Sequence, residues 1–225
     1  NIGLQERIGL FYAVQGIVSL FMPAVIGIIA DRWIQAQRML GICHTLAALF
    51  AGLTAMYGAG FFGSVEFVPL FSIYTLSVAF YMPTIALSNT VAFGTLTRSG
   101  LDFVKAFPPI RTLGTVGFIA SMWLVNSLSF GLAENAQFTY MQLIICGVLG
   151  VVLGLYSFTL PECPLSQSNE KKSLAERFGL DAFVLFKSKT MAMFFIFSML
   201  LGVSLQITNG YATSYINSFQ SISSD

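Results

Sequence analysis

The sequence has 225 residues, of which 56% are hydrophobic, 14% aromatic and only 9% charged, and its mean hydropathy is +0.77. Soluble domains contain about 25% charged residues, so this composition excludes an ordinary soluble protein and indicates an integral membrane protein. The net charge of +1 gives no sign of a nucleic-acid partner, because in membrane proteins the placement of Lys and Arg is more informative than their sum.

Six continuous apolar stretches are long enough, at about 20 residues each, to cross a bilayer as helices. A transmembrane β-barrel would instead show alternating segments of about 10 residues. We therefore predict an all-α, polytopic transmembrane bundle. The predicted spans are residues 8–30, 39–62, 67–94, 108–130, 137–160 and 190–217.

The loops between these spans alternate in basic content. Most Lys and Arg residues fall at 31–38, 95–107 and 161–189, whereas the intervening loops contain no Lys or Arg. The positive-inside bias places the basic loops in the cytoplasm and both ends of the sequence outside. An even number of crossings with both ends outside is unusual, so we expect a further helix ahead of Asn1 and a missing segment at each end.

The longest polar stretch, residues 161–189, is predicted to be a cytoplasmic linker. Within it, Ser173-Leu-Ala-Glu176 has the pattern of a capping box and precedes several aromatic residues among charges. This pattern is typical of an amphipathic helix lying at the membrane interface. The predicted organisation is an amino-terminal bundle at 1–160, the linker at 161–189, and the first helix of a second bundle at 190–225.

The first span ends in Gly27-Ile-Ile-Ala-Asp31-Arg32. A glycine that allows close approach, followed by an acid-base pair directly outside the helix, suits a conformational hinge between moving bundles. In the same span, Gln15 belongs to a short polar face that we interpret as contact between helices rather than as a site.

A regular polar stripe runs down the third span, around Pro83. Its residues recur at steps of three and four, which places them on one helical face. Proline frees a backbone carbonyl one turn earlier, and hydroxyl groups or water must satisfy it. We interpret the stripe as cavity-lining, with helix packing as the alternative. Its members are Tyr74, Ser77, Tyr81, Thr84 and Ser88.

Arg111 is the only charged residue within the apolar stretches. An arginine at the middle of a spanning helix costs about 2.5 to 3.5 kcal/mol on insertion scales, so it must face protein, water or a ligand. Pro108 and Pro109 suit a first helical turn, because its N–H groups have no helical partner. Thr115 and Phe118 share the face of Arg111 and extend the candidate site deeper. The alternative is that Arg111, about 9 Å along the helix from Lys105, reaches the cytoplasmic interface.

The sixth span places Gln206 and Asn209 on one side of a helix, together with Gly202 and Thr213. Carboxamides within a membrane are costly unless they are hydrogen-bonded, and each can both donate and accept. This capacity suits a ligand such as a polyol or nucleobase. We therefore predict that Gln206 and Asn209 bind substrate.

The cysteines show no metal-binding or redox spacing. Cys43 and Cys146 lie in apolar stretches and Cys163 in a polar loop, which is typical of ordinary small hydrophobic residues. His44, near a predicted helix end, is interpreted as a packing residue rather than a proton relay. No metal, other cofactor or enzymatic activity is expected.

Several motifs together resemble a known family. The 27–32 segment resembles the signature between helices two and three of the major facilitator superfamily, although the glycine and basic cluster that usually follow are absent. Other segments closely resemble bacterial nucleoside permeases of the nucleoside:proton symporter family. These are Phe21-Met-Pro-Ala, Ile42-Cys-His-Thr45, Tyr81-Met-Pro-Thr84, Phe107-Pro-Pro-Ile-Arg111, Phe194-Phe-Ile-Phe-Ser-Met-Leu-Leu-Gly202 and Leu205-Gln-Ile-Thr-Asn209.

The resemblance implies a fold of twelve helices in two halves, of which this sequence would supply helices two to seven. It implies proton-coupled nucleoside uptake by alternating access, in a multi-pass protein of the bacterial inner membrane. Nucleoside, proton and membrane lipid are the implied partners, and a monomer is expected. The substrate-site residues carried over from the family are Arg111, Thr115, Phe118, Gln206 and Asn209.

The apolar stretches contain no Asp or Glu, although proton coupling generally needs a titratable group along the path. We therefore expect the proton carrier to lie in a second half beyond this sequence, near Arg111 in the folded protein. Two alternatives to the nucleoside symporter stay open from the sequence. One is a sugar/proton symporter of the same superfamily, and the other is a non-transporting structural or receptor subunit.

Overall fold

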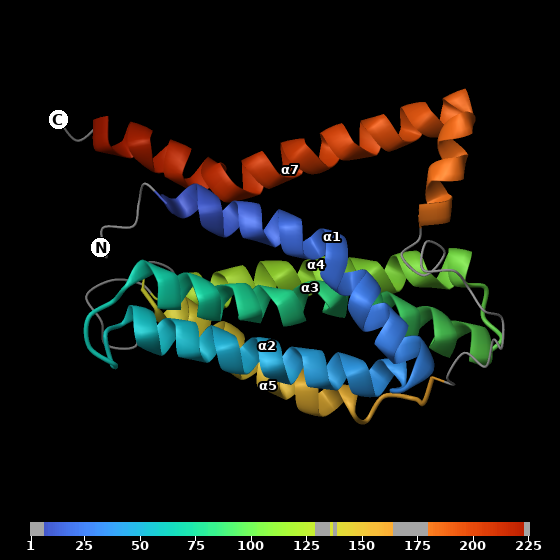
Figure 1. The fold of residues 1–225 in the computed structure, drawn as a ribbon, viewed down its shortest axis with the longest axis horizontal. Coiled ribbons are helices and arrows are strands. Elements are labelled where there is room, and N and C mark those ends of the chain that lie inside the picture. Colours follow the sequence, from blue (N-terminus) through green and yellow to red (C-terminus); the bar gives the residue numbers. More distant parts are fainter. Residues whose placement is uncertain (1–6, 129–135, 137–138, 164–179, 223–225) are drawn as a thin grey trace. The chain divides into compact units, whose positions relative to one another are not determined.

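The computed structural model describes residues 7–128, 136, 139–163 and 180–222, and every regular element within them is helical (Figure 1). This confirms the predicted all-α class. In chain order the elements are α1 (Ile8–Arg32), α2 (Ala36–Gly58), α3 (Phe67–Arg98), α4 (Phe103–Ser127), α5 (Met141–Ser157), the 3-10 helix η3 (Leu180–Lys187) and α7 (Lys189–Ile222).

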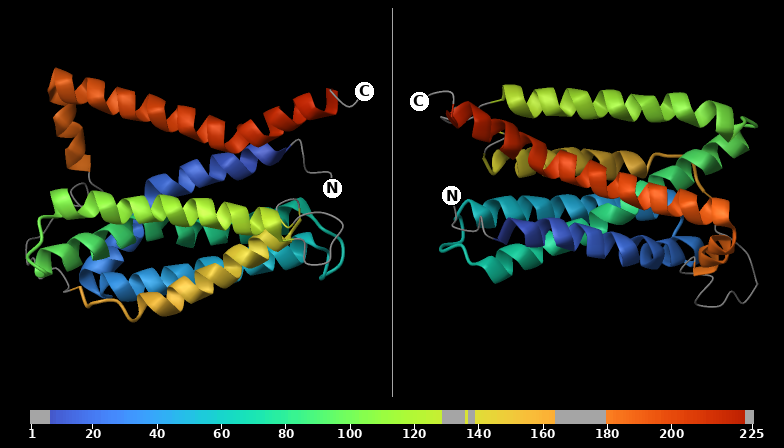
Figure 2. Two further views of the ribbon diagram at one scale, coloured as in Figure 1. Left: turned by 180° about the vertical axis from the view of Figure 1, so that it is seen from behind. Right: turned by 90° about the horizontal axis from the view of Figure 1, so that it is seen from above.

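The chain forms two compact units, an amino-terminal unit (Asn1–Asn169) and a carboxy-terminal unit (Glu170–Asp225). In the amino-terminal unit α2 is central, because it packs against both α3 and α5 (Figure 2). α1 lies along α3 on another side, and α4 contacts only α3 extensively. In the carboxy-terminal unit η3 packs on the start of α7, where Phe186 and Phe195 stack with ring centroids 4.7 Å apart.

Each predicted span coincides with one of the α-helices. Among the described residues, four helices are long and apolar enough to cross a membrane: α1, α2, α3 and the Lys189–Thr208 part of α7. α5 is shorter, with 17 described residues. α4 has 25 residues but is less apolar, because Arg111, two prolines and several hydroxyl residues lie within it. The capping box predicted at 173–176 lies outside the described residues.

Several predicted helix ends differ from the structure by a few residues, and two of these differences concern candidate site residues. α4 begins at Phe103, because the Asp102 side chain caps it by accepting a 3.0 Å hydrogen bond from the N–H of Val104. Pro108 and Pro109 therefore lie inside the helix and not in its first turn. α1 likewise continues to Arg32, so the predicted acid-base pair occupies its last turn rather than the segment after it.

The main core cluster joins α1, α2 and α3 near one end of the amino-terminal unit. Ile26 and Ala30 from α1 meet Cys43 from α2 and Val91 from α3, and all four side chains are buried. Cys163, which follows α5, belongs to the same cluster. The distribution of basic residues predicts that this end faces the cytoplasm. The chain segment leaving α5 is thus packed into the core at the face where the predicted linker begins.

α2 and α5 approach so closely that their contact depends on glycine. A Cβ atom at Gly150 would lie 2.8 Å from Cβ of Ala48, and one at Gly154 would lie 3.2 Å from the backbone oxygen of Gly41 and overlap the Thr45 hydroxyl. That hydroxyl already donates a 2.9 Å hydrogen bond to the oxygen of Gly41 and has little freedom to move. Small residues of this kind allow helix backbones to pack closely in membranes.

We expect Gly154→Ala to destabilise the protein by about 1 to 3 kcal/mol, because the added methyl group must push α2 and α5 apart. The measurement is the melting temperature of the detergent-purified protein. Gly52→Ala in α2 is the matched control, since a Cβ there would meet nothing within 4 Å. Equal melting temperatures for the two variants would contradict the close packing described here.

Candidate functional site

α4 presents the first group of predicted site residues on one continuous face. Arg111, Thr115 and Phe118 are spaced by four and three residues, which brings their side chains to the same side of a helix. All three are exposed in the amino-terminal unit, and Phe118 has 62% of its surface accessible. No described residue of α4 is buried, whereas α2 contributes many residues to the core. The face of α4 is therefore available for a ligand or for another part of the protein.

The neighbours of α4 fix its first turns without covering Arg111. Phe93 of α3 contacts Phe103 and Phe107 with ring-centroid separations of 5.6 and 4.6 Å. Arg111 follows one turn later, at about 12 Å from the start of the helix at 1.5 Å per residue. It makes no ion pair within the part of the chain that the structure describes. Its guanidinium is thus a free multiple donor on the exposed face.

α7 holds the second group of predicted site residues. Gln206 is exposed on this helix, and a Cβ atom at Gly202, one turn earlier, would meet nothing within 4 Å. Asn209 lies in the same helix, three residues after Gln206, and its side chain is outside the described part. The helical spacing places the two carboxamides on adjoining positions of one face. Their convergence with Arg111 stays a prediction.

The side chains of the polar stripe on α3 differ in their hydrogen bonds and in their exposure within the amino-terminal unit. Ser77 donates a 2.9 Å hydrogen bond to the backbone oxygen of Ala47 in α2. Thr84 is buried and donates to the oxygen of Tyr81, at 2.6 Å. Tyr81 and Ser88 are exposed, and the Ser88 hydroxyl donates a 2.9 Å hydrogen bond to the oxygen of Ile85. Ser77 thus joins α3 to α2, whereas Thr84 and Ser88 bond within α3.

Tyr74, at the outer end of the stripe, joins α3 to α1. Nε2 of Gln15 donates a hydrogen bond to its hydroxyl oxygen. This bond agrees with the interpretation of Gln15 as a contact between helices. Beside it, the ring of Phe11 packs edge-on against Phe71 and Tyr74, at 5.3 and 5.0 Å between centroids. The guanidinium of Arg7 lies 4.5 Å from the centre of the Phe67 ring, a cation-π contact at the same end.

The predicted hinge residues lie at the opposite end of α1. Asp31 and Arg32 are both exposed in the last helical turn, and no ion pair joins them among the described residues. Adjacent positions of a helix point in different directions, which explains why the two charges do not meet. Arg32 is favourably placed beside the negative end of the helix dipole. A Cβ atom at Gly27 would meet nothing within 4 Å, so a partner can approach there.

The described residues contain no group of His, Cys, Asp and Glu side chains with the geometry of a metal site. Cys43, Cys146 and Cys163 are all free. His44 is half-buried within α2.

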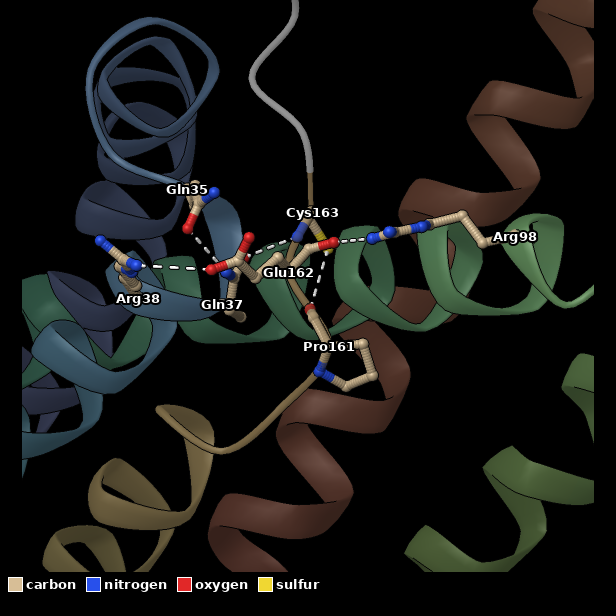
Figure 3. Close-up of polar contacts among 7 residues, drawn as sticks. All are labelled: Gln35, Gln37, Arg38, Arg98, Pro161, Glu162 and Cys163. Carbon is tan, nitrogen blue, oxygen red and sulfur yellow. Dashed lines mark hydrogen bonds and ion pairs between the residues drawn. The ribbon is translucent and has the colours of Figure 1, made fainter.

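One polar cluster that the sequence did not predict lies where the chain leaves α5, at the end of the amino-terminal unit predicted to be cytoplasmic (Figure 3). There Gln37 and Arg38 of α2 and Arg98 at the end of α3 contact the segment 161–163. Gln35, just before α2, accepts a hydrogen bond from Gln37. Arg38 and Arg98 were read only as markers of orientation, and Glu162 only as part of a polar linker. The sequence signal that could have indicated this cluster is Glu162, together with Gln35 and Gln37, among the basic residues of the loops predicted to be cytoplasmic.

Comparison with known proteins relates this chain to membrane permeases. A family model described as "Nucleoside H+ symporter" matches residues 4–225. Among curated proteins, the nucleoside permease NupG of Escherichia coli K12 is 42% identical over 212 residues, which is 94% of this chain and 48% of that protein. The xanthosine permease of the same organism is 41% identical over 215 residues, or 95% of this chain and 48% of the relative.

Solved structures show the same relationship. A crystal structure of the nucleoside transporter NupG matches with a TM-score of 0.72 and 41% identity, over 95% of this chain and 50% of that chain. A crystal structure of a mutant of that transporter matches with a TM-score of 0.78 and 40% identity, over the same shares of the two chains. The chain thus spans about half the length of the relatives that it matches. The fold is that of these transporters, in the part that the chain covers.

We expect Tyr74→Phe to lower the melting temperature of the purified protein, because Gln15 then loses its acceptor in a low-dielectric environment. Hydrogen bonds between membrane helices contribute about 0.6 kcal/mol on average and up to roughly 1.7 kcal/mol. Tyr81→Phe is the matched control, because the Tyr81 hydroxyl makes no helix-joining bond to the residues that the structure describes. An unchanged melting temperature in Tyr74→Phe would favour the cavity-lining interpretation of Tyr74.

Proposed function

Because the chain belongs to the nucleoside H⁺ symporter family, we propose that the protein takes up nucleosides together with protons across the bacterial inner membrane. It acts as a transporter and not as an enzyme, by alternating access between two helical bundles. The observation that carries this proposal is the uncovered face of α4, where a guanidinium, a hydroxyl and an aromatic ring follow one another along one helix.

This face has the chemistry that a nucleoside requires. Arg111 donates hydrogen bonds to a carbonyl or hydroxyl oxygen, and the Thr115 hydroxyl both donates and accepts. Phe118 offers a flat apolar surface on which a base can stack, a contact that contributes about 1 to 3 kcal/mol in nucleic-acid systems. Such a contribution is sufficient to select a nucleoside over a sugar that lacks a base.

The carboxamides of α7 supply the complementary half of the proposed site. Gln206 and Asn209 each offer an acceptor oxygen and two donor hydrogens, which match ribose hydroxyls and the edge of a base. We propose that these two side chains bind the same substrate as Arg111, Thr115 and Phe118. Tyr81 and Ser88, exposed on α3, are proposed to line the cavity, and the same role is proposed for Tyr74, Ser77 and Thr84.

The proton carrier is proposed to lie in a part of the protein beyond this sequence. Within the six described α-helices the only carboxylate is that of Asp31, in the exposed last turn of α1. That position is at the membrane surface and not along the proposed path. The Arg111 guanidinium is suited to hold a carboxylate elsewhere in the cavity, which would couple its protonation to the substrate site.

We propose that residues 1–160 move as one bundle, with Gly27, Asp31 and Arg32 at its hinge with the second bundle. Residues 161–189 form the linker, and 190–225 begin the second bundle. The protein is proposed to act as a monomer in contact with membrane lipid and to need no cofactor.

We expect right-side-out vesicles containing the full-length protein to accumulate uridine when an inward proton gradient is imposed, and to accumulate much less without it. Proton entry down the gradient provides the driving force for uptake against a concentration difference. Competition by adenosine, but not by glucose or fucose, supports a nucleoside site. Competition by the sugars alone would point to a sugar symporter, and the absence of any uptake would contradict transport.

We expect Arg111→Ala and Asn209→Ala each to abolish uptake at low substrate concentration without loss of expression. A hydrogen bond to a charged group contributes about 1.5 to 3 kcal/mol, so the Arg111 variant should lose roughly tenfold or more in affinity. Lys105→Ala removes a cation from the same helix and is the control for Arg111. Thr208→Ala is the control in α7, because its hydroxyl bonds the backbone oxygen of Ser204, at 2.9 Å. Normal uptake by both site variants would remove this site assignment.

A further inference from the structure

The chain leaves the amino-terminal bundle through a segment that is held by its backbone (Figure 3). The N–H of Cys163 donates a 3.0 Å hydrogen bond to Oε1 of Gln37, and the backbone oxygen of Glu162 accepts one from the Arg98 guanidinium. The Cys163 Sγ lies 3.9 Å from the oxygen of Pro161. Residues at the start of α2 and the end of α3 therefore hold the same short stretch.

Gln37 is the buried centre of this arrangement. Its side chain is only 2% exposed, and its Nε2 donates a 3.0 Å hydrogen bond to Oε1 of Gln35, so both ends of the carboxamide are satisfied. The bond between Gln35 and Gln37 fixes which way the carboxamide points. Oε1 is then directed at the N–H of Cys163, a residue 126 positions away in the sequence.

The ion pair in the same place is a weaker contact. Arg38 and the Glu162 carboxylate are separated by 3.5 Å, and their side chains are 59% and 68% exposed. Loss of an exposed ion pair of this kind changes the equilibrium between the bound and released forms of segment 161–163 by at most about fivefold. Loss of the acceptor of a buried N–H changes the same equilibrium by about tenfold or more. We call the contact of segment 161–163 with α2 and α3 the junction. The Gln37 carboxamide therefore contributes more to the stability of the junction than the Glu162 carboxylate does.

We propose that Gln37 is a positioning residue that holds the backbone of Cys163 against α2 and so fixes the point at which the chain leaves the first bundle for the linker. This inference rests on the proposed transport function, because a linker between two moving bundles needs a fixed origin on each. If segment 161–163 is not fixed to α2 and α3, it moves when the second bundle moves. The movement of the second bundle is then not transmitted to α2 and α3. The maximum rate of uptake should then fall, while KM for the nucleoside does not change.

Cys163 reports on the junction independently of transport. Its side chain is 8% exposed and belongs to the core cluster that also contains Cys43. Burial raises the pKa of the Cys163 thiol, and the nearby Arg98 cation partly lowers it. Opening the junction removes the burial, so the fraction of reactive thiolate and its access to reagent both increase. The rate at which N-ethylmaleimide alkylates Cys163 therefore increases with the fraction of molecules in which the junction is open.

The experiment compares Gln37→Met and Glu162→Gln in the full-length protein, with alkylation of each cysteine followed by peptide mass spectrometry. Gln37→Met keeps the side-chain length but removes the acceptor, and should accelerate alkylation of Cys163 on the order of tenfold. Glu162→Gln removes only the ion pair and should leave the rate nearly unchanged. Cys43, which is 0% exposed, is the internal control for general unfolding.

Gln37→Glu tests the acceptor itself, since its Oε1 can still receive the N–H of Cys163. Protection of Cys163 in this variant, together with restored maximum uptake, supports the proposal even if Gln37→Met also exposes Cys43. Equal exposure of Cys163 in Gln37→Glu and Gln37→Met overturns it, as does an effect of Glu162→Gln as large as that of Gln37→Met. Since alkylation does not require transport, absence of uptake in the unsubstituted protein would contradict the proposed function and leave this test valid.

Discussion

The cost of placing a guanidinium within a bilayer is the constraint on which the interpretation of this protein depends. At about 2.5 to 3.5 kcal/mol for a central arginine, the cost is tolerable only if protein, water or ligand replaces the lost hydration. The helices α1, α2, α3 and α5 bury apolar and small side chains against one another, but α4 buries none among the described residues. The helix that carries Arg111 is thus the one whose surface the amino-terminal unit leaves uncovered, as a helix beside a polar pathway requires.

Most of the fold could be predicted because a membrane span needs about 20 apolar residues, a signal that is read directly from the chain. The exact start of α4 could not, since Phe103 to Phe107 contains a lysine and lies just outside the continuous apolar stretch. There a local interaction, the Asp102 cap, sets the first turn. The end of α1 was missed for a similar reason, because a helix can continue through charged residues once it reaches the membrane surface.

The candidate site was accessible to sequence reasoning only in part. Helical spacing predicts that Arg111, Thr115 and Phe118 share one face, since three and four residues make nearly one turn, and in α4 these residues are exposed. Spacing does not say what lies opposite a face, and the α3 stripe illustrates this limit: Tyr74 reaches α1, whereas Ser77 reaches α2. The bond between Gln37 and Cys163 was not predictable, because no periodic pattern connects residues so distant in the sequence.

The glycine contact between α2 and α5 has a consequence for how motion in this protein can be followed. At Gly150, which faces Ala48, and at Gly154, which faces Thr45, the two helices leave no room for a further side chain. We expect helices in such close contact to keep the same separation throughout the proposed transport cycle. A pair of spin labels on their outer ends would serve as a fixed ruler, against which distance changes elsewhere in the protein can be calibrated.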